Sequence, residues 1–255
     1  MHRETGIHQN EMTYAGYRKV PAGEKEKIVQ QHFTAIARRY DLMNSILSFG
    51  FHHFWKRTAV NVLGLKAGDR VIDVCGGTAD LALLAARTIG HAGRVAVYDM
   101  NRAMMKTGRS KAADDPLAEK ICWVQGDAER ISFRDYSFDA AMVGFGVRNL
   151  THMEEGFREM YRVLKPGGKL MCLEFSKPPS PLFRFFYDLY SFTVIPLAGK
   201  LFTGSREAYT YLFESIRLFP LPEDISSLLE KIGFSLVTYH KLTNGVAVIH
   251  LGVKI

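Results

Sequence analysis

A buried strand that turns through glycines straight into a helix constrains the fold of this chain more than any other stretch. Residues 71–77 read Val-Ile-Asp-Val-Cys-Gly-Gly, and an amphipathic pattern runs from Leu81 to Thr88. Glycines at such a corner let a ligand approach the backbone, and Asp73 and Thr78 offer polar groups on either side of them. The stretch predicts the first strand, turn and helix of a nucleotide-binding α/β unit.

A second strand pattern narrows the choice of nucleotide. It runs from Arg94 to Asp99 and ends a little over twenty residues beyond the glycines. An acid there can accept hydrogen bonds from both ribose hydroxyls of an adenosine, which suits a nicotinamide dinucleotide or S-adenosylmethionine. Residues 75–79 lack the G-x-G-x-x-G frame that seats a pyrophosphate, and an acid inside the first strand end suits the ammonium of a methionine moiety. We therefore favour S-adenosylmethionine, with contacts from Asp73, Gly76, Thr78 and Asp99.

Two further strand patterns also end in residues suited to this ligand. Residues 121–125 precede Asp127 and Ala128, and residues 138–143 run into Gly144. An acid after the third strand can accept a hydrogen bond from the exocyclic amine of an adenine. The segment after the fourth strand leaves the sheet at the edge where open α/β folds bind their ligands.

Arg148 and Asn149 follow on that segment and are candidates to contact the reacting group. A cation and an amide that cap the next helix are the competing interpretation. That helix pattern, residues 152–164, meets a Lys-Pro-Gly-Gly stop signal at 165–168, and residues 169–175 form a fifth strand pattern. Strands that alternate with helices in this way predict a parallel sheet with right-handed crossovers.

The chain closes with an expected antiparallel hairpin. Strand patterns at 234–242 and 246–253 are joined by Thr-Asn-Gly, and Asn-Gly between two strands is a strong hairpin signal. Helical patterns at 207–219 and 223–232 precede it. A hairpin that finishes a parallel sheet argues against an ordinary dinucleotide fold, which would continue with further βαβ units.

The N-terminal region is expected to add a lid to a single domain that spans residues 24–255. Residues 1–23 show no hydrophobic period and are expected to form a mobile arm. Helical patterns in residues 24–66 precede the first strand. They suit a lid over the ligand or, alternatively, a helical layer over one edge of the sheet.

An aromatic insert at residues 179–205 breaks the alternation of strands and helices. Its aromatic side chains are interrupted by Arg184, Asp188 and Lys200, so the segment is too charged to span a membrane. So many aromatics exceed what one helix face would bury. We therefore favour the wall of an apolar substrate pocket or a contact with a lipid surface over an ordinary packed helix.

Composition limits the partners and the compartment. The formal net charge of +7 is spread along the chain, which favours a solvated basic surface over nucleic-acid binding and leaves an anionic membrane surface as a third interpretation. The three cysteines lack C-x-x-C spacing and are expected in the core, in a reducing compartment. No metal site is expected, because the adjacent His52 and His53 would point in different directions. Without a signal segment or a spanning stretch, a cytoplasmic location is expected.

The chain resembles the ubiquinone/menaquinone biosynthesis C-methyltransferases, a family of class I S-adenosylmethionine-dependent methyltransferases. The resemblance covers nearly the whole chain from about Phe33, and its most specific motifs are Phe-Gly-Val-Arg-Asn at 145–149 and Glu-Phe-Ser-Lys-Pro at 174–178. It implies a Rossmann-like α/β fold with a mostly parallel seven-stranded sheet, a C-terminal antiparallel hairpin and N-terminal lid helices. It also implies S-adenosylmethionine contacts at Thr78, Asp99, Asp127 and Ala128.

Four positions depart from the pattern of this family. Cys75 and Ala79 stand where the family more often has Ala and Gly, and Asp127 stands where Asn is frequent. Gly144 stands where relatives carry Ser, so that any hydroxyl contact to the donor from that position is lost.

The resemblance implies methyl transfer to a ring carbon of a polyprenylated quinol, from demethylmenaquinol to menaquinol or on a ubiquinol precursor. We expect Arg148 to stabilise the developing phenolate or to activate a water as base, with Asn149 and Tyr40 orienting the ring. Residues 179–205 would receive the isoprenoid tail, with peripheral contact at the inner face of the membrane. The alternatives are another lipophilic acceptor or a scaffold without catalysis. A homodimer is left open, and no nucleic acid is expected.

Overall fold

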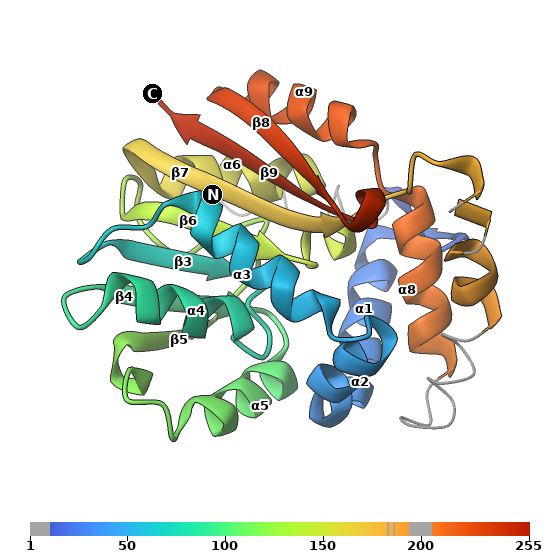
Figure 1. The fold of residues 1–255 in the computed structure, drawn as a ribbon, viewed down its shortest axis with the longest axis horizontal. Coiled ribbons are helices and arrows are strands. Elements are labelled where there is room, and N and C mark those ends of the chain that lie inside the picture. The colour runs from blue at the N-terminus through green and yellow to red at the C-terminus, as the bar shows by residue number, and fades with distance from the viewer. Residues whose placement is uncertain (1–10, 183, 186, 194–205) are drawn as a thin grey trace.

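The computed structural model describes residues 11–182, 184–185, 187–193 and 206–255, and it centres on one seven-stranded sheet with the order β5-β4-β3-β6-β7-β9-β8 (Figure 1). The strands are β3 (Arg70–Val74), β4 (Arg94–Asp99), β5 (Ile121–Gln125), β6 (Phe138–Gly144), β7 (Leu164–Phe175), β8 (Phe234–Leu242) and β9 (Ala247–Lys254). The pairs from β5 to β7 are parallel, whereas β9 pairs antiparallel with β7 and β8. The predicted fold class, including the closing hairpin, is confirmed.

The strand order places a topological switch point between β3 and β6. The chain runs outward from β3 through β4 to β5 and then returns to β6 on the other side of β3. In an open parallel sheet, ligands bind beside the carboxyl ends of the strands at such a point. The loops after β3 and β6 are therefore the place where a site is expected, and both carry the glycines singled out in the sequence.

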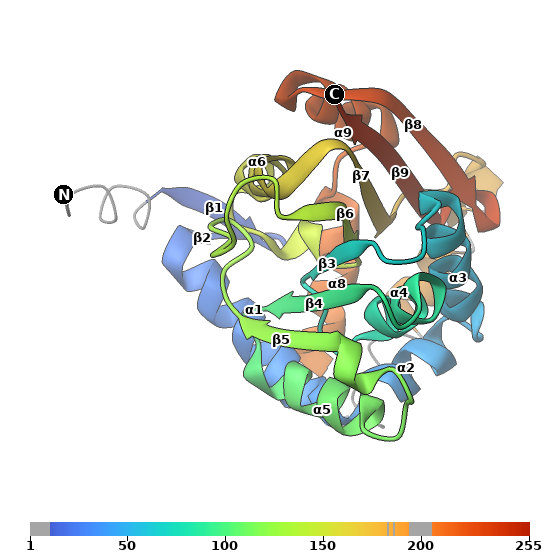
Figure 2. The ribbon, with the colours of Figure 1, turned by 90° about the vertical axis from the view of Figure 1, so that its left-hand side faces the viewer.

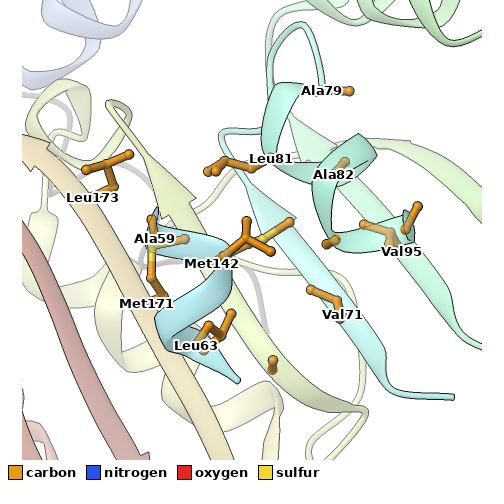
Figure 3. Packing of buried hydrophobic residues seen from close by; sticks show 14 of the residues in the cluster. Ala59, Leu63, Val71, Ala79, Leu81, Ala82, Val95, Met142, Met171 and Leu173 are labelled. Atoms are coloured by element: carbon orange, nitrogen blue, oxygen red, sulfur yellow. The ribbon is translucent and has the colours of Figure 1, made fainter. Parts of the chain in front are cut away.

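Consecutive residues of the central strands point alternately into two hydrophobic cores, one on each face of the sheet. On one face, Val71 of β3 packs with residues of α3 and α4 (Figure 3). On the other face, Ile72 and Val74 pack with residues of α6 and α9. The α-helices with defined bounds are α1 (Ala22–Ile36), α2 (Tyr40–Leu47), α3 (Phe51–Leu63), α4 (Asp80–Ile89), α5 (Arg102–Ala112), α6 (Met153–Val163), α8 (Arg206–Leu218) and α9 (Pro222–Ile232). Both faces are covered, which explains why these strands are almost continuously apolar.

The N-terminal region contains a structured hairpin where a mobile arm was expected. β1 (Met12–Ala15) and β2 (Arg18–Pro21) pair antiparallel and lie beside α1 (Figure 2). Ala15 and Val20 are buried against α1 and α8. Each strand buries so few apolar side chains that no period is visible in the sequence. Residues 1–10 of the expected arm lie outside the described residues.

The Lys-Pro-Gly-Gly segment at 165–168 does not separate helix from strand as expected. α6 ends at Val163, and β7 begins at once with Leu164. The pairing with β6 then jumps, because Leu164 lies opposite Phe138 whereas Lys169 lies opposite Ala140. The proline and glycines are thus accommodated in an irregularity within β7, where fewer ladder hydrogen bonds are required.

The structure also bears on the expected positions of the cysteines and of the aromatic insert. Cys172 is buried, but Cys122 is exposed because it lies on β5 at the edge of the sheet. Of the expected aromatic insert, residues 181–182, 184–185 and 187–193 are helical, and its other residues from 183 to 205 lie outside the described ranges. In the described part of the chain, every helix is too short or too polar to cross a lipid bilayer.

Phe157 of α6 offers a test of the packing on its face of the sheet. Its side chain is fully buried among residues of the sheet and α9. We expect Phe157→Ala to lower the free energy of unfolding by about 3–5 kcal/mol, because it removes buried area and leaves a cavity. In urea denaturation, the control Leu236→Ala, at a side chain that is 75% exposed, should change it by less than about 0.5 kcal/mol. An unchanged midpoint for Phe157→Ala would contradict this packing.

Candidate functional site

Two adjoining pockets lie at the carboxyl ends of the central strands. The polar pocket has a cavity volume of about 360 Å³ and lies against the loops after β3, β4 and β6. The aromatic pocket, of about 100 Å³, lies between these loops and the helices α1, α2, α3 and α8. Figure 1 shows α1, α2 and α8 gathered at that end of the sheet. Both pockets are lined by Phe33, Tyr40, Phe145 and Asn149.

All seven residues predicted to bind the nucleotide line the polar pocket. They come from the carboxyl ends of β3, β4 and β6 and from the segments after β3 and β5, and are Asp73, Gly76, Thr78, Asp99, Asp127, Ala128 and Gly144. Parallel strands bring their carboxyl ends to one edge, so residues far apart in the sequence meet there. The structure therefore brings the seven residues together in one pocket, and their contact with a nucleotide stays a prediction.

The glycine corner after β3 is tightly folded. A Cβ atom on Gly76 would lie 2.9 Å from the backbone oxygen of Asp73, so no larger residue fits without a shift of the backbone. Cys75 and Ala79 adopt left-handed backbone conformations with φ of 55° and 65°. Such conformations cost a residue with a side chain about 1–2 kcal/mol each. The corner is thus held in a strained shape that brings backbone groups close to the pocket.

Asp99 lines the polar pocket, and two backbone N–H groups hold its carboxylate there. Its Oδ2 accepts a hydrogen bond from the N–H of Gly77 (2.8 Å), and its Oδ1 accepts one from the N–H of Asn101 (2.6 Å). Burial raises the pKa of Asp99 to about 6. The two backbone donors fix the carboxylate at the end of β4 and tie it to the glycine corner.

Asp73 presents a buried oxygen without a partner among the described residues. Its Oδ2 accepts a hydrogen bond from the N–H of Ala82 (3.1 Å), whereas Oδ1 has no hydrogen bond there. Burial raises the pKa of Asp73 to about 8. A buried carboxylate that lacks a counter-charge is costly, and a cation in the pocket would relieve that cost. The free acceptor oxygen of Asp73 therefore fits the ammonium of a methionine moiety, which would donate to it.

Thr78 and Asp127 are each tied to the protein. The Thr78 hydroxyl donates to Oδ1 of Asp41 (2.6 Å), on α2. Asp127 accepts the N–H of Glu129 (2.9 Å), and Ala128 is buried beside it. Thr78 thus lines the polar pocket, but its hydroxyl proton is used in the hydrogen bond to α2. We call α1, α2 and α3 the N-terminal helical layer.

Asp41 belongs to a chain of ion pairs that holds this layer over the glycine corner. Lys111 of α5 contacts both Asp41 (2.7 Å) and Asp80 (2.5 Å), and Lys56 of α3 contacts Asp80 (2.6 Å). Burial alone would raise the pKa of Asp80, but the two lysines hold it well below its usual range. No pattern in the sequence marks the Asp41 contact, because its partners are distant along the chain.

The aromatic pocket has a wall of rings from segments that are far apart in the sequence. Its rings are His32, Phe33, Tyr40, His52, Trp55, Phe145, Phe175, Tyr187, Tyr190, Tyr209 and Tyr211. Tyr187 and Tyr190 come from the expected aromatic insert, so the prediction that this segment walls a pocket agrees with its described part. The contributions of α1 and α8 were missed, because their ring spacing is also that of ordinary core helices.

Arg148 lies in the aromatic pocket but not in the polar one. Its Nη1 donates to the Phe145 carbonyl (2.6 Å) and to both Oε1 (3.1 Å) and Oε2 (2.9 Å) of Glu174. Both charged side chains are almost fully buried, at 4% and 1% exposed. Burial raises the pKa of Glu174, although Arg148 acts in the opposite direction. The competing interpretation of Arg148 as a helix cap is not supported, since its hydrogen bonds go elsewhere.

The backbone carbonyl of Phe145 holds the side chains of Arg148 and Asn149, both of which were predicted to lie at the site. Its φ of 57° is left-handed, and its carbonyl accepts from Arg148 and, at 3.4 Å, from Nδ2 of Asn149. A Cβ atom on Gly146 would lie 2.4 Å from Cβ of Cys75, so the loops after β3 and β6 can pack this closely only with glycine there. Asn149 and Tyr40 line both pockets, and Arg148 lines the second.

Comparison with known proteins agrees with this geometry. Residues 21–254 match the family model of the ubiE/COQ5 methyltransferase family. The chain belongs to this family. It is 46% identical over 249 residues to the ubiquinone/menaquinone biosynthesis C-methyltransferase UbiE of Pseudomonas putida, which covers 98% of this chain and 97% of that protein. For the UbiE of Pseudomonas paraeruginosa the identity is 45% over 242 residues, which covers 95% and 94%.

Solved structures share the fold of this family member. A SAM-dependent methyltransferase from Thermotoga maritima has a TM-score of 0.63 at 19% identity and covers 89% of this chain and 100% of its own. The [4+2]-cyclase SpnF has a TM-score of 0.66 at 15% identity and covers 90% and 96%. A cyclase among these structures indicates that the fold alone does not fix the reaction.

The packing around Gly144 bears on one departure of this chain from the family pattern. A Cβ atom on Gly144 would lie 2.5 Å from Cδ1 of Leu81, so a serine at this position would require Leu81 to turn away. The backbone of Gly144 lines the polar pocket without a hydroxyl. S-adenosylmethionine is the methyl donor of this enzyme class, and the polar pocket offers acids for its ammonium, ribose and adenine groups. In the described part of the chain, no three His, Cys, Asp or Glu side chains gather as a metal site.

The unpartnered oxygen of Asp73 makes donor binding dependent on protons. At pH 7 a carboxyl with a pKa of about 8 is mostly neutral, and a cation beside it favours the ionised form. Binding of S-adenosylmethionine should therefore release about 0.5–1 proton at pH 7, and the affinity should rise with pH up to about 8. Titration calorimetry in buffers of different ionisation enthalpy measures this release.

The control for this prediction is Asp73→Asn, which keeps the shape of the side chain. We expect it to bind the donor more weakly and to release almost no proton. Equal proton release from both proteins would show that Asp73 does not face the ammonium.

Proposed function

We propose that this chain transfers a methyl group from S-adenosylmethionine to a ring carbon of a polyprenylated quinol, converting demethylmenaquinol to menaquinol. The observation that carries the proposal is the shared wall of the two pockets, formed by Phe33, Tyr40, Phe145 and Asn149. A donor in the polar pocket and a flat aromatic acceptor in the aromatic pocket would meet at this wall. The relatives from Pseudomonas are named for ubiquinone and menaquinone biosynthesis, which supports a quinol acceptor.

The charge arrangement of the aromatic pocket suits a neutral acceptor that becomes anionic. A hydroxyl beside the reacting carbon must lose its proton so that electron density moves onto the ring. Arg148 lines this pocket with its charge partly balanced by Glu174. It can stabilise a developing phenolate, but it cannot act as the base, because a guanidinium stays protonated.

The reaction needs positioning more than covalent chemistry by the protein. S-adenosylmethionine supplies an electrophilic methyl group, whose bond to sulfur breaks as the bond to the ring carbon forms. Asn149 and Tyr40, at the junction, would hold the ring in line for this displacement. The ring proton at the methylated carbon then leaves and the oxygen takes a proton back, which restores the aromatic quinol with the net release of one proton and of S-adenosylhomocysteine.

A benzoquinol precursor of ubiquinol is the second candidate acceptor. The names of the relatives cover both quinones, and a benzoquinol head also has a hydroxyl next to the reacting carbon. Anaerobic assays of the purified protein with each reduced quinol, followed by mass spectrometry of the products, separate the two. The absence of methylated product from both would contradict the proposed function, and another lipophilic acceptor would then be sought.

Arg148 provides the sharpest test of the chemistry. We expect Arg148→Ala to lower kcat for the accepted quinol by about 10²–10³-fold, because a preorganised donor to a developing oxyanion is lost. The dissociation constant of S-adenosylmethionine should stay unchanged, since Arg148 does not line the polar pocket. Asp99→Ala is the converse control: it should weaken the binding of S-adenosylmethionine, because Asp99 lines the polar pocket. Full turnover by Arg148→Ala would reject this role.

We also propose a peripheral contact with the membrane, where such a quinol is dissolved. We call apolar corner the exposed apolar side chains of α2, the loop after it, α3 and the helical residues after β7, segments that also line the aromatic pocket: Leu42, Ile46, Phe49, Phe51, Phe54, Leu182, Phe185, Leu189 and Phe192. The Phe49 ring lies 5.8 Å from that of Tyr190, and Phe51 stacks on Trp55 at 6.4 Å. Tyr190 and Trp55 both line the aromatic pocket. An apolar patch at a pocket mouth suits a lipid surface.

The apolar corner predicts that membrane binding depends on its most exposed rings. Phe49 and Phe54 are 77% and 56% exposed. We expect the double variant Phe49→Ser and Phe54→Ser to lower co-sedimentation with anionic phospholipid vesicles at least about tenfold, because insertion of each ring contributes 1.5 kcal/mol or more. Leu236→Ser, at an equally exposed side chain on β8, should bind as the wild type does. Absence of wild-type co-sedimentation would contradict the membrane contact.

A further inference from the structure

Tyr211 of α8 places its hydroxyl on a residue at the junction of the two pockets. The hydroxyl donates to Oδ1 of Asn149 at 3.1 Å. The side chain is 7% exposed, and burial raises the pKa of Tyr211 to about 12. Tyr211 therefore remains a hydrogen-bond donor throughout the physiological pH range.

This contact decides which way the Asn149 carboxamide points. The Phe145 carbonyl can only accept, so it requires the Nδ2 group of Asn149 on its side, where the two atoms lie 3.4 Å apart. Oδ1 must then face Tyr211, whose hydroxyl donates to it. The two contacts agree on one orientation, and the opposite one would set two carbonyl oxygens against each other.

The orientation leaves a donor for a ligand. Nδ2 carries two N–H groups, and its hydrogen bond in the described part of the chain goes to Phe145. Asn149 lines both pockets. One N–H can therefore serve an oxygen of a molecule that lies at the junction.

The N-terminal hairpin and α1 hold Tyr211 in place. Ala15, Val20 and Val29 form one buried cluster with Tyr211, and the ring of His32 lies 5.3 Å from the Tyr211 ring. The turn of the hairpin is also fixed to the same helix, because the N–H of Tyr17 donates to Oε2 of Glu214 at 3.0 Å. The hairpin precedes the stretch matched by the family model, which begins at residue 21.

We propose that Tyr211 is a positioning residue that aims an N–H of Asn149 at the acceptor oxygen next to the methylated carbon. The hairpin of residues 12–21 packs with α1 around the Tyr211 side chain and so belongs functionally to the acceptor site. The inference rests on the proposed function, because it assigns this donor to a quinol oxygen. The oriented N–H group of Asn149 would favour acceptors that carry an oxygen beside the reacting carbon.

A double-mutant cycle tests whether Tyr211 acts through Asn149. We expect Tyr211→Phe to lower kcat for the quinol about tenfold, as the loss of one oriented hydrogen bond does, with an unchanged KM for S-adenosylmethionine. In an Asn149→Ala background, Tyr211→Phe should cause less than about a twofold further loss. Equal losses in both backgrounds would overturn the proposal, because a merely structural role does not depend on Asn149.

Tyr190→Phe is the matched control for this cycle. It also removes a tyrosine hydroxyl from the aromatic pocket, but that hydroxyl donates to the Leu47 carbonyl at 3.0 Å and not to Asn149. We expect the effects of Tyr190→Phe and Asn149→Ala on kcat to multiply. Strong non-additivity for this pair as well would show that the cycle does not isolate Tyr211, and would overturn the inference.

A measurement without substrate separates this proposal from the proposed function. In protein labelled with ¹⁵N-asparagine, the carboxamide signals of Asn149, identified by their loss in Asn149→Ala, should exchange slowly with solvent. They should exchange at least about tenfold faster in Tyr211→Phe, since a locked amide opens less often. Equal exchange rates would overturn the positioning role even if the wild type methylates quinols. Slow exchange in a protein that methylates no quinol would leave the proposed function alone refuted.

Val20→Ala tests the contribution of the hairpin. It loosens the packing on Tyr211 and touches neither pocket. We expect a two- to threefold loss of kcat, about the effect of partial misorientation, and no loss in the Asn149→Ala background. The same loss in both backgrounds would limit the hairpin to a stabilising role and overturn that part of the proposal.

Discussion

The carbonyl of Phe145 is the interaction on which the candidate site depends. It accepts from Arg148 and from Asn149, the two polar side chains on which the proposed chemistry relies. It can do so because Phe145 adopts a left-handed backbone between two glycines. This conformation costs about 1–2 kcal/mol, which the hydrogen bond from its N–H to the Leu173 carbonyl (2.8 Å) and the burial of its ring help to offset. The strain lies where strand β6 meets the ligand edge, as is usual for functional sites.

The second organising feature is the connection between the N-terminal helices and the glycine corner. Asp41 links α2 to Thr78 and to Lys111 of α5, and the neighbouring Tyr40 lines both pockets. The same helix and its loop carry exposed apolar side chains such as Phe49. The segment of α2 and its following loop therefore contacts the polar pocket, the aromatic pocket and the outer surface. An acceptor that enters from a lipid surface would be met by side chains that are already positioned by the ion pairs at the donor side.

The sequence predicted the polar pocket better than the aromatic one, and the reason is physical. Asp73, Asp99 and Asp127 end successive parallel strands, and such ends must meet at one edge of the sheet. Tyr211 lies 62 residues from its partner Asn149, on a helix whose apolar spacing is that of any core helix, so nothing in the pattern marks it. Glu174 was visible as an acid at a strand end, but its pairing with Arg148 depends on the register of β6 and β7, which the sequence does not specify.

The division of the site into a sheet-edge pocket and a helix-walled pocket explains how one fold supports different reactions. The cyclase SpnF and the methyltransferase from Thermotoga maritima share the fold with this chain at 15% and 19% identity, and only the sheet edge follows directly from the fold. The acceptor wall comes from α1, α3, α8 and residues 187–190, which can change without disturbing the strands. Within that wall, a lone buried arginine would cost several kcal/mol. Pairing Arg148 with Glu174 allows an apolar pocket to contain a cation, which in the proposed reaction would stabilise negative charge only as it develops on the acceptor.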